Sequence, residues 1–172
     1  MSVMGTRADF YVGKDEKAEW VGSTAWDGYR EGIQLTGKNK GFLGIPESRT
    51  FPKGKHLFDA TTEEEFRDRL AQYFANREDV TLPKDGWPWP WDDSGTSDCS
   101  YWFFDGKVWD AQRNRSFDVY ALATKALPED DDEREAVLDK REPIRYPNMK
   151  SKQNVTLGNR SGLIVVASRE QP

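Results

Sequence analysis

Alternating apolar and polar positions predict two strands at the start of the chain. The first is expected over Ala8 to Gly13, where a Gly-Lys-Asp turn follows, and the second over Glu19 to Trp26. A period of two in the second strand places four residues on one face: Trp20, Gly22, Thr24 and Trp26. Two such runs joined by a short charged loop indicate an antiparallel hairpin.

A helical period begins at residue 62. Thr62 followed by Glu65 forms a capping-box pattern, which would satisfy two backbone donors at the start of a helix. The apolar residues then recur at helical spacing, at Phe66, Leu70, Tyr73 and Phe74. The spacing predicts an amphipathic helix that runs to about Arg77.

Further strands are expected in the second half of the chain. Cys99 to Asp110 is typical of a hairpin that turns at Asp105-Gly106, Phe117 to Ala123 alternates, and Leu163 to Ala167 is a β-branched run. A short helix is expected to begin near Asp131. The pattern predicts one α+β domain over residues 1–172: a small, mostly antiparallel sheet of two hairpins and a C-terminal strand, covered by one main amphipathic helix and a shorter one.

Three segments fall outside this regular pattern. Residues 32–55 are predicted to form a long ordered loop, and such loops in compact domains often carry function. Residues 83–93 contain three prolines spaced among tryptophans, which favours an extended conformation. Residues 127–142 hold eight acidic and three basic residues.

Composition narrows the class of protein. Aromatic residues make up 13% of the 172 residues and include seven tryptophans, which argues against a disordered chain. The single cysteine excludes an intramolecular disulfide and suits a reducing compartment. The N-terminus lacks an apolar signal region, and the longest apolar run, Leu163 to Ala167, is too short to cross a bilayer. We therefore expect a cytoplasmic protein without a membrane segment.

The distribution of charge along the chain indicates which class of partner the protein could bind. The net charge is −5, and the last thirty residues alone lean basic, with five basic residues against one acidic. A nucleic-acid binder usually presents a basic face, so the acidic middle of the chain argues against direct nucleic-acid binding. The same acidity is compatible with a basic surface on a protein partner.

Catalytic patterns are sparse. One histidine and one cysteine cannot build a His/Cys zinc site. A nucleophilic pair of Cys99 and His56 is formally possible, but no local motif surrounds either residue, and ordinary structural roles are the favoured interpretation. No phosphate-binding glycine motif is present, and no cofactor or metal is expected.

A cluster of acidic residues supplies an alternative function. The spacing of Asp92, Asp98, Asp105 and Lys107 weakly matches the acids and lysine of metal-dependent nucleases, in which carboxylates hold Mg²⁺. A hairpin turn at Asp105-Gly106 explains the same residues without a metal. A small metal-dependent hydrolase or nuclease is therefore the second hypothesis.

The candidate partner-binding residues lie in two of the irregular segments. Prolines hold Trp87, Trp89 and Trp91 in an extended loop, and ordered indoles lose little entropy on binding. The alternative is that these rings close one end of the core. The acidic run contributes Asp130, Asp131, Asp132 and Glu133, either as a solvated helix start or as a surface that steers a basic partner.

The amino-acid sequence of the predicted N-terminal hairpin resembles that of a known group of proteins. The stretches Thr6 to Gly13, Ala18 to Ser23 and Ala25 to Tyr29, and to a lesser extent Asn154 to Gly158, resemble uncharacterised accessory proteins of phages and prophages of Gram-negative bacteria. The resemblance implies no catalytic residues. It implies a non-enzymatic protein in the cytoplasm of a bacterial host that binds and inhibits or modulates a host or defence protein, as anti-CRISPR inhibitors do.

Overall fold

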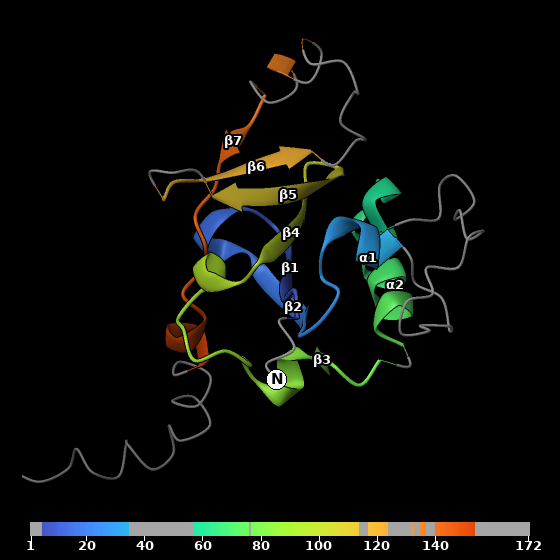
Figure 1. The fold of residues 1–172 in the computed structure, drawn as a ribbon, viewed down its shortest axis with the longest axis vertical. Coiled ribbons are helices and arrows are strands. Elements are labelled where there is room, and N and C mark those ends of the chain that lie inside the picture. Colours follow the sequence, from blue (N-terminus) through green and yellow to red (C-terminus); the bar gives the residue numbers. More distant parts are fainter. Residues whose placement is uncertain are drawn as a thin grey trace, which may run out of the picture.

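The computed structural model describes residues 5–34, 57–75, 77–113, 117–123, 132, 135–136 and 140–153. Within these residues one mixed sheet has the strand order β3-β2-β1-β4-β5-β6-β7 (Figure 1). The strands are β1 Ala8–Val12, β2 Glu19–Thr24, β3 Val80–Thr81, β4 Cys99–Phe104, β5 Lys107–Arg113, β6 Val119–Ala123 and β7 Glu142–Pro143. All neighbours are antiparallel except β1 and β4, which are parallel. The α+β class is confirmed, and both predicted hairpins are present as β1–β2 and β4–β5.

Helix α2, Glu63–Phe74, forms where the capping pattern and the apolar spacing predict it. The Thr62 side chain accepts a hydrogen bond from the Glu65 amide at 3.2 Å. The Glu65 carboxylate accepts a hydrogen bond from the Thr61 amide at 2.9 Å. In a standard capping box the donor would be the amide of Thr62, one residue later. The helix ends at Phe74 instead of near Arg77, with Ala75 as the C-terminal cap.

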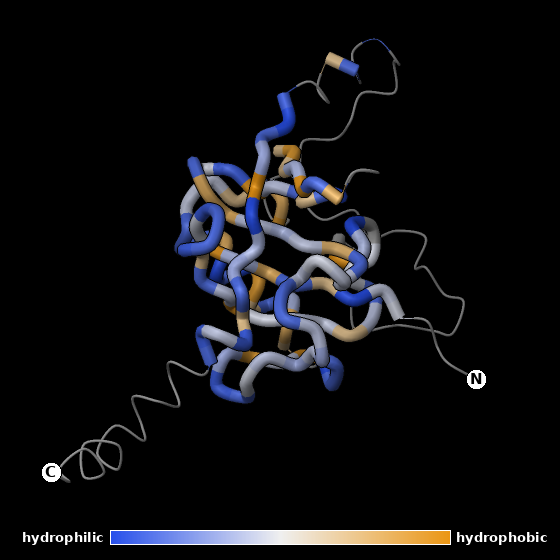
Figure 2. Tube along the Cα trace, turned by 90° about the vertical axis from the view of Figure 1, so that its left-hand side faces the viewer, coloured by the Kyte–Doolittle hydropathy of each residue, from blue (hydrophilic) through white to orange (hydrophobic). Residues whose placement is uncertain are grey.

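Helix α2 covers one face of the sheet, together with the short helix α1, Arg30–Gln34, and a 3₁₀ turn at Leu57–Asp59 (Figure 1). This helix-covered face is an apolar core in which Phe66 stacks on Phe103 with ring centroids 5.5 Å apart. The other buried members are Ala8, Phe10, Ile33, Leu57, Phe58, Ala60, Leu70, Tyr73, Tyr101 and Val108. Figure 2 shows the apolar segments gathered inside the molecule and polar segments around them.

The opposite face of the sheet is covered by irregular segments: residues 83–98, which we call the tryptophan loop, and residues 144–149 (Figure 1). On this loop-covered face, the pairing register of the strands places side chains in two rows that run across the strands. One row is aromatic and runs across Trp20, Tyr11, Trp102 and Trp109. The next row is small and polar and runs across Ser23, Asp9, Ser100 and Ala111. The small row leaves room for side chains of the covering loop.

A β-bulge in the first hairpin contradicts the predicted facing of the second strand. Register shifts between Phe10 and Tyr11, so that Phe10 opposes Gly22 while Tyr11 opposes Trp20. Phe10 and Tyr11 belong to opposite faces, and Trp20 and Gly22 therefore do too. Trp26 lies beyond the strand and is 50% exposed. A bulge inserts one residue, and simple alternation cannot anticipate it.

Other predicted elements differ in place or lie outside the described residues. The described short helix is α1, near the start of the segment predicted as a loop over 32–55, most of which is not described. The predicted C-terminal strand at 163–167 lies outside the described residues, as does most of the predicted helix near Asp131. Edge strands β3 and β7 were not predicted, because two-residue strands carry no periodic signal.

Candidate functional site

The centre of the loop-covered face is a buried carboxylate. Asp9 is fully buried on β1, in the middle of the sheet. Its Oδ1 accepts hydrogen bonds from Ser23 Oγ at 2.5 Å and Trp89 Nε1 at 2.7 Å. Its Oδ2 accepts from Ser94 Oγ at 2.6 Å and Ser97 Oγ at 2.5 Å. Three of these four donors, Trp89, Ser94 and Ser97, belong to the tryptophan loop, so one carboxyl group ties the loop to the sheet.

The network extends one step further on each side of Asp9. Trp20 Nε1 donates to Ser23 Oγ at 3.0 Å, and the Tyr11 hydroxyl lies 2.5 Å from Ser94 Oγ. Because the Ser94 proton goes to Asp9, the Tyr11 hydroxyl is the donor in this second bond. The donors from β2, β1 and the loop therefore form one connected arrangement around Asp9.

Burial dominates the electrostatics of this network. It raises the pKa of Asp9 above the ordinary aspartate value, and the hydrogen bonds from Ser23, Ser94, Ser97 and Trp89 oppose that rise without cancelling it. No cation is among the hydrogen-bond partners of its carboxyl oxygens. Burial likewise raises the pKa of Tyr11, so its hydroxyl stays a proton donor at any physiological pH.

The tryptophan loop is fastened at further points. Trp87 is buried and forms an edge-on contact with Trp20 at 5.2 Å, and its Nε1 donates to the Trp91 carbonyl at 2.7 Å. The Met149 amide donates to the Asp92 carbonyl at 2.7 Å, and Lys150 Nζ lies 3.1 Å from the Asp92 carboxylate. The loop is thus held by the ring contact of Trp87 and by a main-chain bond and an ion pair at Asp92.

The outer part of the loop presents an aromatic pair. Trp89 and Trp91 are each half-buried, and their rings stack with centroids 5.6 Å apart at 16°. The Arg7 guanidinium lies 5.0 Å from the Trp91 ring centroid and is anchored by Asp98 at 3.0 Å. Trp91 Nε1 is buried and has no hydrogen-bond partner among the described residues. We call these two rings with Arg7 the aromatic platform.

The three tryptophans proposed as binding residues therefore have different positions. Trp87 packs inside the core and is not accessible to a partner. Trp89 and Trp91 keep part of their rings at the surface while also packing against the loop-covered core. Both interpretations of the tryptophan loop, core closure and exposed surface, thus describe part of it.

The structure separates the four residues of the hydrolase hypothesis. Asp98 and Asp105 lie just outside opposite ends of the six-residue strand β4, so their carboxylates face different parts of the molecule. Asp105 has a φ of 52° in the hairpin turn, as the turn interpretation requires. Asp92 pairs with Lys150, and Lys107 Nζ lies 5.9 Å from the Trp109 ring. Across the described residues no group of three or more His, Cys, Asp or Glu side chains is placed to hold a metal ion.

The other candidate residues, the cysteine–histidine pair and the acidic run, form no site within the described part of the chain. Cys99 is half-buried at the start of β4 and packs against the helix-covered core, while His56 lies outside the described residues. Of the acidic run, Asp132 is described and exposed, and Asp130, Asp131 and Glu133 lie outside the described residues.

Sequence reasoning missed Asp9 and its serine donors. An aspartate within an alternating strand normally faces solvent. The hydrogen bonds between Asp9 and the loop join residues that are about 80 to 90 positions apart, so no local sequence pattern predicts them. One signal was present: Ser94 and Ser97 come a few residues after the tryptophans, where hydroxyl groups could fasten the loop to the rest of the molecule.

Fold and site together define an α+β protein with a loop-built aromatic platform. Comparison with family models, curated proteins and solved structures finds no match for this chain. None of the described helices is long and apolar enough to cross a membrane.

Proposed function

We propose that this chain is a non-catalytic binding protein that engages another protein through the aromatic platform. The observation that carries the proposal is the stacked pair of Trp89 and Trp91, which stays partly exposed while the loop that carries it is fastened to Asp9. A surface that is already ordered loses little conformational entropy when a partner binds. Tryptophan and arginine are the residue types enriched at interface hot spots.

The platform is costly as a purely structural element. A buried indole N–H without a partner lowers stability, and the Trp91 Nε1 is in that position within the described residues.

The setting of the proposed partner rests on the resemblance of the N-terminal stretches alone. A phage accessory protein that inhibits or modulates a bacterial host or defence protein remains our proposal for that setting. The exposed Asp132 is compatible with a partner that carries a basic surface.

The test is affinity capture from bacterial lysate with three purified proteins: wild type, Trp91→Ala and Phe117→Ala. Trp91→Ala removes one ring of the platform and leaves every hydrogen bond of Asp9 in place. Phe117 is 75% exposed and lies outside the platform, so Phe117→Ala is the matched control for loss of an exposed aromatic ring.

We expect one stoichiometric partner that wild type and Phe117→Ala retain and that Trp91→Ala loses. The isolated partner should then bind purified wild type with a Kd at least about tenfold tighter than Trp91→Ala, the loss of one hot-spot residue. A partner held equally by all three proteins would remove the platform from the proposal. Absence of any partner would count against a binding function.

A further inference from the structure

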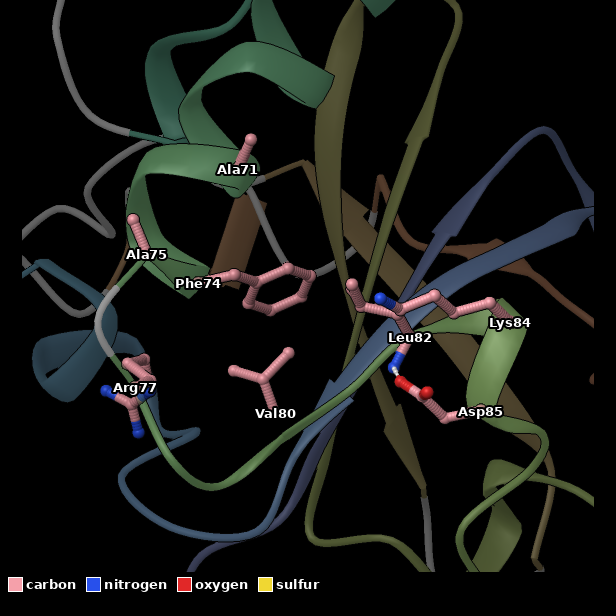
Figure 3. Close-up of a pocket in the computed structure, with 8 residues that line it drawn as sticks. All are labelled: Ala71, Phe74, Ala75, Arg77, Val80, Leu82, Lys84 and Asp85. Carbon is pink, nitrogen blue, oxygen red and sulfur yellow. Dashed lines mark hydrogen bonds between the residues drawn. The ribbon is translucent and has the colours of Figure 1, made fainter.

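A second surface lies at the β3 edge of the sheet, beside the start of the tryptophan loop. A groove of about 420 Å³ opens between the C-terminal end of α2 and β3 (Figure 3). Its floor is apolar, and Figure 3 shows Phe74 facing Val80, with Leu82 beside them. Its charged rim consists of Arg77, Lys84 and Asp85. None of the residues of the aromatic platform lines it.

The strand beside the groove has a free edge within the described part of the chain. Among the described strands, β3 is the first in the sheet order and pairs with β2 alone. The Ala25 amide donates to the Asp79 carbonyl at 3.0 Å, which makes Asp79 and Ala25 a hydrogen-bonded pair. Directly opposed residues alternate in antiparallel pairing, so the next pair, Val80 and Thr24, is not hydrogen-bonded. The amide and carbonyl of Val80 therefore point away from β2, toward the open side.

The free edge is limited in length. The Leu82 amide donates to the Asp85 carboxylate at 3.3 Å, and the Leu82 carbonyl accepts from the Asp85 amide at 2.9 Å. These bonds occupy the main-chain groups of the next residue that would point outward. Val80 is thus the residue through which another strand could pair, directly above the apolar floor of the groove.

An exposed aromatic residue flanks the same edge. The Trp26 amide donates to the Asp79 carboxylate at 3.0 Å, and its carbonyl accepts from Arg77 at 2.9 Å. The Trp26 side chain is nevertheless 50% exposed. The side chains of Asp79 and Arg77 thus hold the main chain of Trp26 close to the Arg77 end of the groove. A large exposed apolar side chain next to an apolar groove is typical of an interaction surface.

Charge on the rim indicates the kind of segment that fits. Arg77 is committed to Asp79 at 2.8 Å, a pair that is largely buried, and Asp85 is committed to Leu82. Lys84 is exposed, and the described part of the chain supplies it with no ion-pair partner. The carboxylate of Asp85 keeps its negative charge, so the rim is neutral overall, and Lys84 supplies a local positive charge at one end of the groove.

We propose that this edge binds an extended segment of a partner protein, with one apolar and one acidic side chain on the same face, by strand addition. The segment pairs its main chain with Val80, places an apolar side chain in the groove against Phe74 and Leu82, and sets a carboxylate against Lys84. Main-chain bonds supply affinity in this mode of recognition, and the pocket for alternate side chains supplies specificity. This surface shares no lining residue with the aromatic platform, although Lys84 and Asp85 belong to the tryptophan loop.

Val80→Pro isolates the central contact. Proline removes the outward-pointing amide of residue 80, which makes no hydrogen bond to β2. Because edge strands tolerate proline, we expect the fold to be retained. The probe is a random dodecapeptide display library selected on wild type. Selected peptides are then synthesised, and their Kd is measured for wild type, Val80→Pro, Lys84→Glu and Lys107→Glu. Lys107 lies at the β4–β5 turn and serves as the matched charge control.

We expect the selected peptides to share an apolar residue and an acidic residue two positions apart. Val80→Pro should weaken their binding about tenfold, the usual worth of one hydrogen bond in a binding equilibrium. Lys84→Glu should weaken it further for acidic peptides, and Lys107→Glu should leave it unchanged. Circular dichroism of each variant verifies that the fold is retained.

Four outcomes would overturn the proposal. The first is a library that yields no enriched sequence. The second is peptides that bind Val80→Pro as tightly as wild type. The third is enriched sequences with apolar residues three and four positions apart, which would assign the groove to a helix. The fourth is concentration-dependent dimerisation that Val80→Pro abolishes, which would assign the edge to a second copy of the chain.

Discussion

The two faces of the sheet are built from different physical contacts. On the helix-covered face α2 lays an apolar stripe on the strands, and the contacts are between rings and aliphatic side chains. On the loop-covered face a fully buried carboxyl group collects four hydrogen bonds beneath an irregular loop. Apolar burial is not directional, whereas hydrogen bonds require particular partners at particular distances.

The difference assigns separate tasks to the two faces. The helix-covered face contributes apolar area and therefore stability. The loop-covered face contributes a fixed conformation, because moving the tryptophan loop would take away three of the four hydrogen-bond donors of the buried Asp9 carboxyl group. We infer that the first face mainly sets how stable the molecule is, and the second mainly sets where the aromatic platform lies.

The largest loss of stability is expected on the helix-covered face. Phe66 is fully buried, and Phe66→Ala should lower the free energy of unfolding by roughly 3–5 kcal/mol, since it removes apolar contacts and leaves a cavity. Denaturant unfolding measures this loss. Phe66→Leu is the control and should retain most of the stability. Loosening of the tryptophan loop in the folded Phe66→Ala variant would break the proposed division of tasks.

Substitution at Asp9 tests the other face. Asp9→Leu removes the acceptor of Trp89 Nε1 and three hydroxyl groups, and we expect a loss on the order of 3 kcal/mol together with a loosened loop. Asp9→Asn should cost much less, because the hydroxyls of Ser94 and Ser97 can reverse and accept from its amide group. Equal losses for both variants would show that the hydrogen-bond arrangement does not matter.

The pH dependence of stability follows from the raised pKa of Asp9. The folded state holds its proton to a higher pH than the unfolded state does, so its contribution to stability is largest below the ordinary aspartate pKa and falls as pH rises through the raised value. We expect the difference in unfolding free energy between wild type and Asp9→Asn to decrease from about pH 3.5 upward and then level off. If the difference in unfolding free energy grew with pH over this range, the four hydrogen bonds would lower the pKa of Asp9 by more than burial raises it.

The smallest effect is expected at the start of α2. Thr62→Ala removes the acceptor of the Glu65 amide and should cost about 1 kcal/mol. Thr61→Ala is the matched control, since the Thr61 main-chain bond to Glu65 remains, and it should cost less. Thermal unfolding of both variants measures the difference. A larger loss for Thr61→Ala would show that the Glu65 carboxylate, and not the Thr62 cap, secures the helix start.

The same division explains what could be predicted from the sequence. Local signals predicted the helix from Thr62 and the hairpin turn at Asp105-Gly106, because each depends on residues a few positions apart. The parallel pairing of β1 with β4 and the hydrogen bonds of Asp9 join segments about 90 residues apart, and no local pattern encodes them. The bulge that separates Trp20 from Gly22 shows the same limit within a single hairpin.

The candidate site was predictable in part. Proline spacing singled out Trp89 and Trp91, which the structure leaves half-exposed, but it could not separate them from Trp87, which is buried. Burial of one ring among three depends on its register against the sheet. The aspartates grouped by sequence proximity are separated, because β4 carries Asp98 and Asp105 to opposite ends.

The most direct test of this account is hydrogen exchange of the Trp89 indole N–H, followed by ¹⁵N NMR in wild type and Asp9→Leu. The Trp109 indole donates to the Phe104 carbonyl at 2.9 Å on the same face and is the internal reference. If Asp9 holds the loop, exchange at Trp89 is slow in wild type and fast in Asp9→Leu, while exchange at Trp109 stays slow in both. Fast exchange at Trp89 in wild type, or slow exchange in both proteins, would contradict the claim that Asp9 fixes the aromatic platform.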